Sequence, residues 1–294
     1  MKRFACILLL LMLIMTPALQ ETKTDRVTFS TGDDDIIDVL VIGNSFCTGW
    51  QDELYGMLHA AGTRVIFSGA IHPGSSLSQH CEWAQNGDKE YRFRSYRSSA
   101  KSLNKYPVDL EYCLSRTNWD VISIQEAFFS LVDEECDEAE IRRNTKALAS
   151  ELYGYIRLRC PQAALVWNQT WAVEVGWHRN QYSVKTQADQ DYMYRVIREI
   201  GDEVAAENGA YVAPTGTAFQ IARANGSGDL SRDGCHDGAE TGGQYLNACV
   251  WLEFITGESC IGNTWRPTKY ALDEERITLM QQAAHAAVCE YMGR

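Results

Sequence analysis

The segment IDVLVIGNSFCTGW, residues 37–50, decides the fold class, because its apolar run stops abruptly at Gly43, Asn44 and Ser45. Residues 38–42 are almost uninterruptedly apolar, as a parallel strand covered by helices on both faces requires. Apolar residues at helical spacing follow from Trp50, and Gly62 is placed to end that helix. Two interpretations of the polar turn remain open: it only reverses the chain, or it holds a nucleophile at the end of the strand.

Short apolar runs and long amphipathic segments continue to alternate along the chain. Further strands are predicted at residues 65–68, 121–125, 164–167 and 211–212, and further helices at about 141–156, 187–207, 245–255 and 277–291. Strands that alternate with helices at this spacing indicate a parallel sheet with helices on both faces. We therefore predict an α/β fold, a three-layer α/β/α sandwich with about five parallel strands, over a single domain of residues 37–294.

The N-terminus is typical of an export signal. Lys2 and Arg3 precede an apolar run over residues 7–15, and Thr16-Pro17-Ala18 offers a small-residue cleavage site. The run is shorter than the roughly 20 apolar residues that a membrane-spanning helix needs. We predict a signal peptide at residues 1–18 and a flexible lead-in at residues 19–36. The mature protein would be secreted or periplasmic, without a membrane span.

Charge and cysteine content narrow the possible partners. The formal net charge is −12, and it becomes −14 once Lys2 and Arg3 leave with the signal, which disfavours nucleic acid as a partner. Nine of the ten cysteines would remain, an odd number, so their pairing cannot be read from the sequence. No Cys-x-x-Cys motif or close Cys/His quartet is present, so we expect no metal or other cofactor.

The turn after the first strand favours a chemical role for Ser45. In open α/β sheets, ligands bind outside the carboxyl ends of the strands. A serine alcohol needs a base, normally a histidine held by a carboxylate. Among six histidines only His236 has a suitable acid, Asp233, three residues before it in a glycine-rich stretch. The simpler alternative is a turn stabilised by Asp233 beside a surface histidine. Cys47 is a weaker candidate nucleophile, because a buried cysteine is usually inert.

Taken together, these two motifs resemble the SGNH, or GDSL-like, hydrolase superfamily. Its first block is Gly-Asp/Asn-Ser after the first strand, and its last block is Asp-x-x-His near the C-terminus; both occur here in that order. The resemblance implies a flavodoxin-like fold. It also implies ester hydrolysis with Ser45 as nucleophile, His236 as base and Asp233 as the acid that orients it.

The oxyanion hole that the resemblance implies is only partly matched. Gly74, after the second strand, corresponds to the glycine whose backbone amide joins the hole, although it could serve only the turn after Pro73. The Gly-x-Asn-Asp block after the third strand is replaced by residues 127–130, Ala-Phe-Phe-Ser. Gln125 is the nearest amide, and Asn168 is its rival. Residues 119–125 resemble a WDxIxxQ segment found in a poorly characterised secreted branch of the superfamily.

The identity of the substrate rests on the resemblance. Many secreted members of the superfamily remove acetyl or other small acyl groups from carbohydrates, which implies a small-molecule or glycan ester as substrate. Trp171 and Trp177 follow the fourth strand, where aromatic faces could stack on sugar rings, although aromatic residues more often fill cores. A lipase, thioesterase or acyltransferase would use the same residues. A missing oxyanion donor also leaves open a weakly catalytic or non-catalytic glycan-binding protein.

Overall fold

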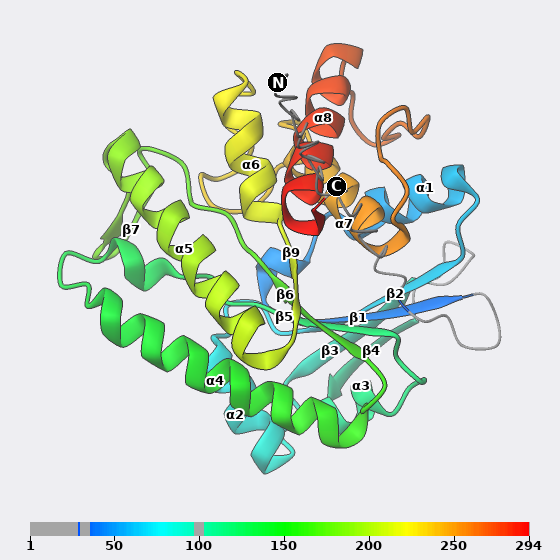
Figure 1. The fold of residues 1–294 in the computed structure, drawn as a ribbon, viewed down its shortest axis with the longest axis vertical. Coiled ribbons are helices and arrows are strands. Elements are labelled where there is room, and N and C mark those ends of the chain that lie inside the picture. The colour runs from blue at the N-terminus through cyan, green and yellow to red at the C-terminus, as the bar shows by residue number, and fades with distance from the viewer. Residues whose placement is uncertain (1–28, 30–35, 97–102, 294) are drawn as a thin grey trace, which may run out of the picture.

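A seven-stranded sheet runs through the middle of the molecule (Figure 1). The computed structural model describes residues 29, 36–96 and 103–293, so the predicted signal peptide lies outside the described residues, as does the predicted lead-in apart from Phe29 and Ile36. The strands are β1 (Ile37–Gly43), β2 (Val65–Ile71), β3 (Tyr91–Tyr96), β4 (Leu103–Val108), β5 (Val121–Ile124), β6 (Ala164–Asn168), β7 (His178–Arg179), β8 (Tyr182–Ser183) and β9 (Tyr211–Ala213).

Five of the seven strands form the parallel core of the sheet. Their spatial order is β2-β1-β5-β6-β9, and each neighbouring pair is parallel. This order is that of flavodoxin-like sheets, which confirms the predicted fold class. β3 and β4, which extend the sheet beyond β2 as antiparallel strands, were not predicted from the sequence. β3 has the alternation of a strand with one buried face, because Tyr91, Phe93 and Ser95 are buried and separated by arginines.

Helices cover both faces of the sheet in the predicted three layers (Figure 1). One layer holds α2, α3, α4 and α5, and the other holds α1, α6, α7 and α8. The helices are α1 (Gln51–Ala61), α2 (Leu77–Asn86), α3 (Leu110–Leu114), α4 (Glu138–Arg159), α5 (Gln187–Asn208), α6 (Thr215–Ala224), α7 (Gly243–Thr256) and α8 (Glu274–Met292), with short 3₁₀ helices η1 (Ser45–Cys47) and η2 (Phe129–Val132).

The core is densest around β1 and α7. Residues 39–41 of β1 are fully buried, and α7 is buried along nearly its whole length, because α1, α6 and α8 pack around it. The rings of Trp50 and Trp251 stack with their centroids 5.5 Å apart, which fixes the start of α1 against α7. β1 is therefore held on every side, and the turn that follows it starts from a rigid strand.

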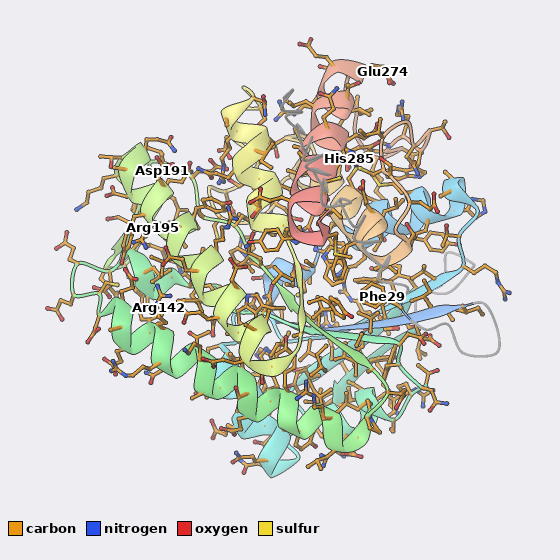
Figure 2. All side chains as sticks on the ribbon, in the orientation of Figure 1. Phe29, Arg142, Asp191, Arg195, Glu274 and His285 are labelled. Carbon is orange, nitrogen blue, oxygen red and sulfur yellow. The ribbon has the colours of Figure 1, made fainter. Side chains whose placement is uncertain are left out.

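Contacts at the periphery extend this core. Phe29, one of the two described residues of the predicted lead-in, is buried against Phe254 and Tyr211 (Figure 2). Arg142 of α4 forms ion pairs with Glu138 at 2.9 Å and with Glu199 of α5 at 2.8 Å, which joins two neighbouring helices. Within the described parts of the chain, no helix combines the length and the apolar character needed to cross a bilayer.

Candidate active site

Ser45 begins the 3₁₀ helix that directly follows β1. The side chain of Asn44 caps this helix, because its Oδ1 accepts the amide hydrogen of Phe46 at 3.1 Å. Phe46 and Cys47 are buried and anchor the short helix in the core, whereas Ser45 is only partly buried. The local structure thus holds the Ser45 hydroxyl at the carboxyl edge of the sheet.

The structure brings His236 and Asp233 to this hydroxyl, although 191 residues separate Ser45 from His236. His236 Nε2 lies 2.9 Å from Ser45 Oγ, and His236 Nδ1 lies 2.7 Å from Asp233 Oδ2. A carboxylate at Nδ1 leaves Nε2 as the nitrogen that can accept a proton. The three predicted catalytic residues therefore form one continuous chain of hydrogen bonds, with the geometry of a serine-hydrolase triad.

The turn between Asp233 and His236 keeps the carboxyl group of Asp233 ionised. Burial acts to raise the pKa of Asp233, but hydrogen bonds from the amide and ring of His236 outweigh it and hold that pKa below its ordinary value. Gly234 makes the turn possible, since its φ of +79° is unfavourable for other residues. A Cβ on Gly234 would also lie 2.8 Å from the ring of Trp177.

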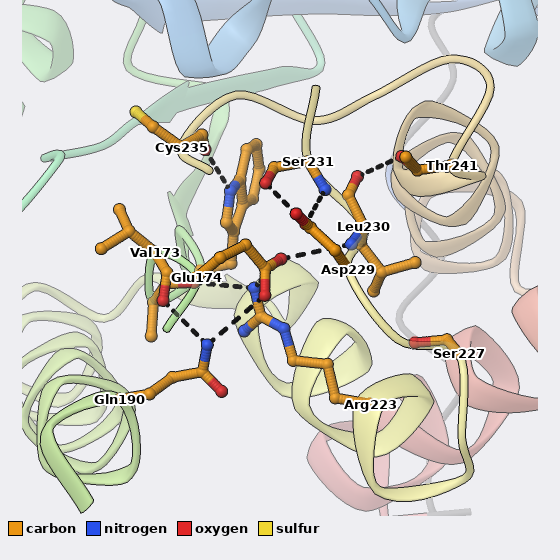
Figure 3. A network of polar contacts seen from close by, with 12 residues as sticks. Val173, Glu174, Gln190, Arg223, Ser227, Asp229, Leu230, Ser231, Cys235 and Thr241 are labelled. Carbon is orange, nitrogen blue, oxygen red and sulfur yellow. Dashed lines mark hydrogen bonds and ion pairs between the residues drawn. The ribbon is translucent and has the colours of Figure 1, made fainter. Parts of the chain in front are cut away.

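A buried ion pair holds the loop that carries this turn (Figure 3). Glu174 Oε1 accepts from Arg223 at 2.7 Å and from the amide of Leu230 at 3.2 Å, and both charged side chains are about nine-tenths buried. The amide of Glu174 in turn donates to the carbonyl of Gly234 at 2.8 Å. Trp171 adds a bond from its indole nitrogen to the carbonyl of Cys235. The loop before α7 is therefore fixed to α6 and to the segment that follows β6.

A small pocket opens above Ser45, with a volume of about 130 Å³. It is lined by residues 44–46 and 74–76, by Glu126, Ala127 and Phe129, and by Arg179 and His236. A larger cavity of about 410 Å³ lies at the opposite, amino edge of the sheet, beside Ile36 and Val65. The larger cavity is far from the triad, so we assign the chemistry to the smaller pocket.

Two backbone amides face this pocket as candidate oxyanion donors. The amide hydrogens of Ser45 and Gly74 take part in no hydrogen bond with the residues that the structure describes. Gly74 has a φ of +81°, a left-handed conformation that favours glycine at this position. Serine proteases also build an oxyanion hole from two backbone amides, so this pair is sufficient for the chemistry.

Gln125 does not take the place predicted from the sequence. Its Nε2 donates to Asn44 Oδ1 at 2.6 Å, and its side chain is buried and absent from the lining of the pocket. Asn168 is also fully buried and lies behind it, with its Nδ2 3.5 Å from Gln125 Oε1. Both amides point into the protein. The geometry therefore favours a supporting role for Gln125, as the partner that fixes the side chain of Asn44.

The two tryptophans after β6 have different environments. Trp171 is fully buried, and its ring stacks on Phe219 with the centroids 4.5 Å apart, so it cannot serve as a platform for a sugar. That part of the prediction is corrected, because the segment after β6 turns back into the core. Trp177 is only partly buried and stacks on Phe129, which lines the pocket. Trp177 alone remains a candidate for substrate contact.

Other reactive groups are placed away from the pocket or are inactivated by burial. Cys47 is fully buried, and burial raises the pKa of its thiol strongly, so it stays protonated. Glu253, His285 and Cys289 could offer three ligand atoms to a metal ion, but they lie on α7 and α8. Asp233, Cys235 and His236 form a second group whose possible ligand atoms lie within 4.8 Å of one another, and in this structure Asp233 and His236 are joined in the hydrogen-bond chain to Ser45.

Three residues of the site were missed from the sequence. Glu126 is the second residue after β5, near the strand end where a site residue could have been sought. Arg179 lies on the two-residue strand β7, which is too short to leave a pattern. Asp237 follows His236 and is almost completely buried, with the side chain of Asn247 3.4 Å away. Burial raises the pKa of Asp237 well above its ordinary value.

Comparisons with known proteins place this chain in a family. Residues 38–287 match the family model described as a domain of unknown function, DUF4886. The chain belongs to the DUF4886 family. The crystal structure of a DUF4886 family protein from Bacteroides uniformis ATCC 8492 is 30% identical, with a TM-score of 0.75, and the match covers 86% of this chain and 95% of that one. No curated protein matches the sequence significantly.

More distant structures share the fold. A protein from Parabacteroides merdae ATCC 43184, proposed to be a GDSL-like lipase, is 14% identical with a TM-score of 0.50, and the match covers 76% of this chain and 96% of that one. An α/β hydrolase enzyme from the metagenome of Lake Arreo, Spain, is 12% identical with a TM-score of 0.51, over 78% and 97% of the two chains. The resemblance to SGNH hydrolases is thereby confirmed for the fold of this DUF4886 protein.

The nucleophile can be tested by exchanging two neighbouring residues of this DUF4886 protein. Ser45→Ala should lower kcat for ester hydrolysis by about 10⁴-fold or more, because it removes the attacking oxygen. Cys47→Ala should keep most of the activity, since the buried thiol does not reach the substrate. Both variants would be assayed on 4-nitrophenyl acetate, with thermal denaturation as a control for folding. An active Ser45→Ala variant beside an inactive Cys47→Ala variant would reverse the assignment.

The role of Gln125 can be separated from direct oxyanion binding. Gln125→Ala should lower the free energy of unfolding by about 1–3 kcal/mol, because it removes the buried hydrogen bonds of Gln125 to Asn44 and Asn168. Exposed Gln85→Ala on α2 is the control and should change little. Denaturant titration and kcat would be measured together. A kcat loss of about 100-fold with unchanged stability would instead indicate that Gln125 donates to the oxyanion.

The buried carboxyl group of Asp237 predicts a pH-dependent stability. Because its pKa is raised in the folded state, wild-type stability should fall as pH rises above the unfolded value of about 3.9. Asp237→Asn removes this ionisation, so its Tm should exceed that of the wild type at pH 8, and the gain should shrink toward pH 4. Asp233→Asn is the control and should change Tm in the opposite direction, with a lower Tm than the wild type at pH 8, because the pKa of Asp233 is lowered in the folded state. Equal pH profiles of Tm for Asp237→Asn and the wild type would refute this account.

Proposed function

We propose that this protein is a serine esterase that hydrolyses small acyl esters, with acetylated carbohydrates as its substrates. The observation that carries the proposal is the chain of hydrogen bonds Ser45–His236–Asp233, with distances of 2.9 and 2.7 Å, at a pocket where the amides of Ser45 and Gly74 have no partner among the described residues. A non-catalytic binding protein has no need of this combination.

Each residue takes a role that follows from its position. His236 Nε2 accepts the proton of Ser45 as the Ser45 oxygen attacks the acyl carbon. Negative charge then develops on the acyl oxygen, where the amides of Ser45 and Gly74 donate hydrogen bonds. His236 returns the proton to the leaving alcohol, and water subsequently releases the acyl group from Ser45. Asp233, ionised at neutral pH, stabilises the imidazolium that forms in between.

The size of the pocket supports a short acyl group. Its volume of about 130 Å³ is well below the roughly 300–1,000 Å³ of pockets for drug-sized ligands. Phe46, Ala127 and Phe129 are the apolar residues that line it, and the ring of Phe129 is stacked on Trp177. A long acyl chain would have to displace this stack, which disfavours a lipase.

Carbohydrate substrates and export are further parts of the proposal. Trp177 is partly exposed and stacks on Phe129, which lines the pocket, and aromatic rings of this kind are what sugars stack on. The signal-like residues 1–18 support export from the cytoplasm, to where polysaccharides are met. Acyl transfer would use the same residues with a sugar in place of water, and no observation favours it over hydrolysis.

Acyl-chain preference tests the function. The 4-nitrophenyl esters of acetate, butyrate and octanoate should show kcat/KM falling by about 10-fold or more at each step. Phe129→Ala should widen the pocket and reduce this preference, whereas Ser45→Ala should remove the activity on all three. A serine-directed fluorophosphonate should label the wild type at Ser45 only. Absence of both labelling and hydrolysis would refute the esterase, and a preference for octanoate would refute the small acyl group.

A further inference from the structure

Arg179 is the one cationic side chain of arginine or lysine that lines the pocket above Ser45, as far as the structure describes the chain. It lies on β7, and its side chain is exposed. Its guanidinium group makes no hydrogen bond or ion pair with any other described residue. Its guanidinium group is therefore available to a ligand.

The backbone around Arg179 is held in place. β7 pairs with β8 so that Arg179 lies opposite Tyr182, and Tyr182 is bridged in turn to Asp133 at the end of η2. The amide of Val184 donates to the carbonyl of Trp177 at 2.9 Å, which closes the base of this hairpin. The hairpin thus presents Arg179 next to Trp177 from a defined position.

The acidic group in the same pocket does not neutralise Arg179. Glu126 Oε2 accepts the amide hydrogen of Leu77 and its Oε1 accepts that of Ala127, both at 2.7 Å. Both carboxyl oxygens are thus engaged with the backbone, and Glu126 joins the end of β5 to the start of α2. No ion pair links it to Arg179. The carboxyl group of Glu126 therefore holds the backbone in place, whereas the guanidinium group of Arg179 faces the solvent.

We propose that Arg179 binds a carboxylate on the alcohol side of the ester, so that the preferred substrates are acetyl esters of acidic sugars such as uronic acids. This inference rests on the proposed function. The acyl group occupies the small pocket at Ser45, so the alcohol extends outward, where Arg179 is exposed and Trp177 is partly exposed. A guanidinium group matches a planar carboxylate with two parallel hydrogen bonds, and Trp177 offers a face for the sugar ring.

A matched pair of substrates isolates the effect of the sugar's carboxylate charge. Acetylated methyl glucuronoside would be compared with its uronamide, in which a neutral carboxamide replaces the carboxylate, by the rate of acetate release. The wild type should prefer the charged sugar by about 10-fold in kcat/KM. Arg179→Met should lose this preference, so that its rates on the two sugars become equal. Arg143→Met on α4, which replaces another exposed arginine, should behave as the wild type. Equal rates on the two sugars, or a preference that survives Arg179→Met, would overturn the proposal.

A second comparison uses substrates that carry the carboxylate on the acyl group instead of the alcohol. The 4-nitrophenyl monoester of succinic acid carries its carboxylate on the acyl group, and 4-nitrophenyl butyrate is its neutral counterpart of equal chain length. We expect no preference for the succinate. An Arg179-dependent preference for it would overturn the assignment of the carboxylate to the alcohol side.

A binding measurement keeps this inference separable from the esterase activity. Ser45→Ala should bind acetylated methyl glucuronoside about 10-fold more tightly than the uronamide in calorimetry, and the added Arg179→Met substitution should abolish the difference. If the wild type hydrolysed no ester, including 4-nitrophenyl acetate, the proposed function would fail, while this difference in affinity would still support the carboxylate site. Equal affinities for the two sugars would refute it.

Discussion

Three strand ends meet at the carboxamide of Asn44, a side chain that is almost completely buried. Its Oδ1 accepts from the amide of Phe46 and from Gln125 at the end of β5, and its Nδ2 donates to the carbonyl of Ser75 in the loop after β2. A buried polar group must have its hydrogen bonds satisfied, so these three segments can pack in few other ways. The orientation of Ser45 and the position of the Gly74 amide both depend on this side chain.

Supporting contacts extend this constraint to the second half of the site. Ser75 Oγ lies 2.9 Å from Nε2 of the buried His80, whose Nδ1 lies 2.9 Å from the hydroxyl of Tyr91 on β3. Burial lowers the pKa of His80 to about 3, so the ring is neutral and acts as a fixed hydrogen-bonding spacer. The antiparallel strand β3 thus has a purpose beyond extending the sheet, because Tyr91 supports the loop of the oxyanion donor.

The sequence was informative where a local pattern determines the structure. Apolar runs and helical spacing predicted the five parallel strands, and the Asp233-x-x-His236 spacing predicted a contact that the fold then brings to Ser45. It was uninformative where a side chain's direction decides the role. Gln125 follows the correct strand, but whether its amide turns to the pocket or to Asn44 depends on packing against β1. Trp171 likewise follows β6, and only the fold shows that its ring is buried against Phe219.

Two carboxyl groups flank His236, and their environments explain why only one pairs with its ring. Asp233 is about half exposed and receives hydrogen bonds from the backbone amides of Cys235 and His236, so it remains ionised. Asp237 is buried beside Asn247, where a charge is costly and the proton is retained to higher pH. An orienting acid must be negative when the imidazolium forms, because its contribution is electrostatic. Partial exposure of Asp233 is therefore a requirement of the site, and the glycine turn that keeps this side chain at the surface is as important to the chemistry as the carboxylate itself.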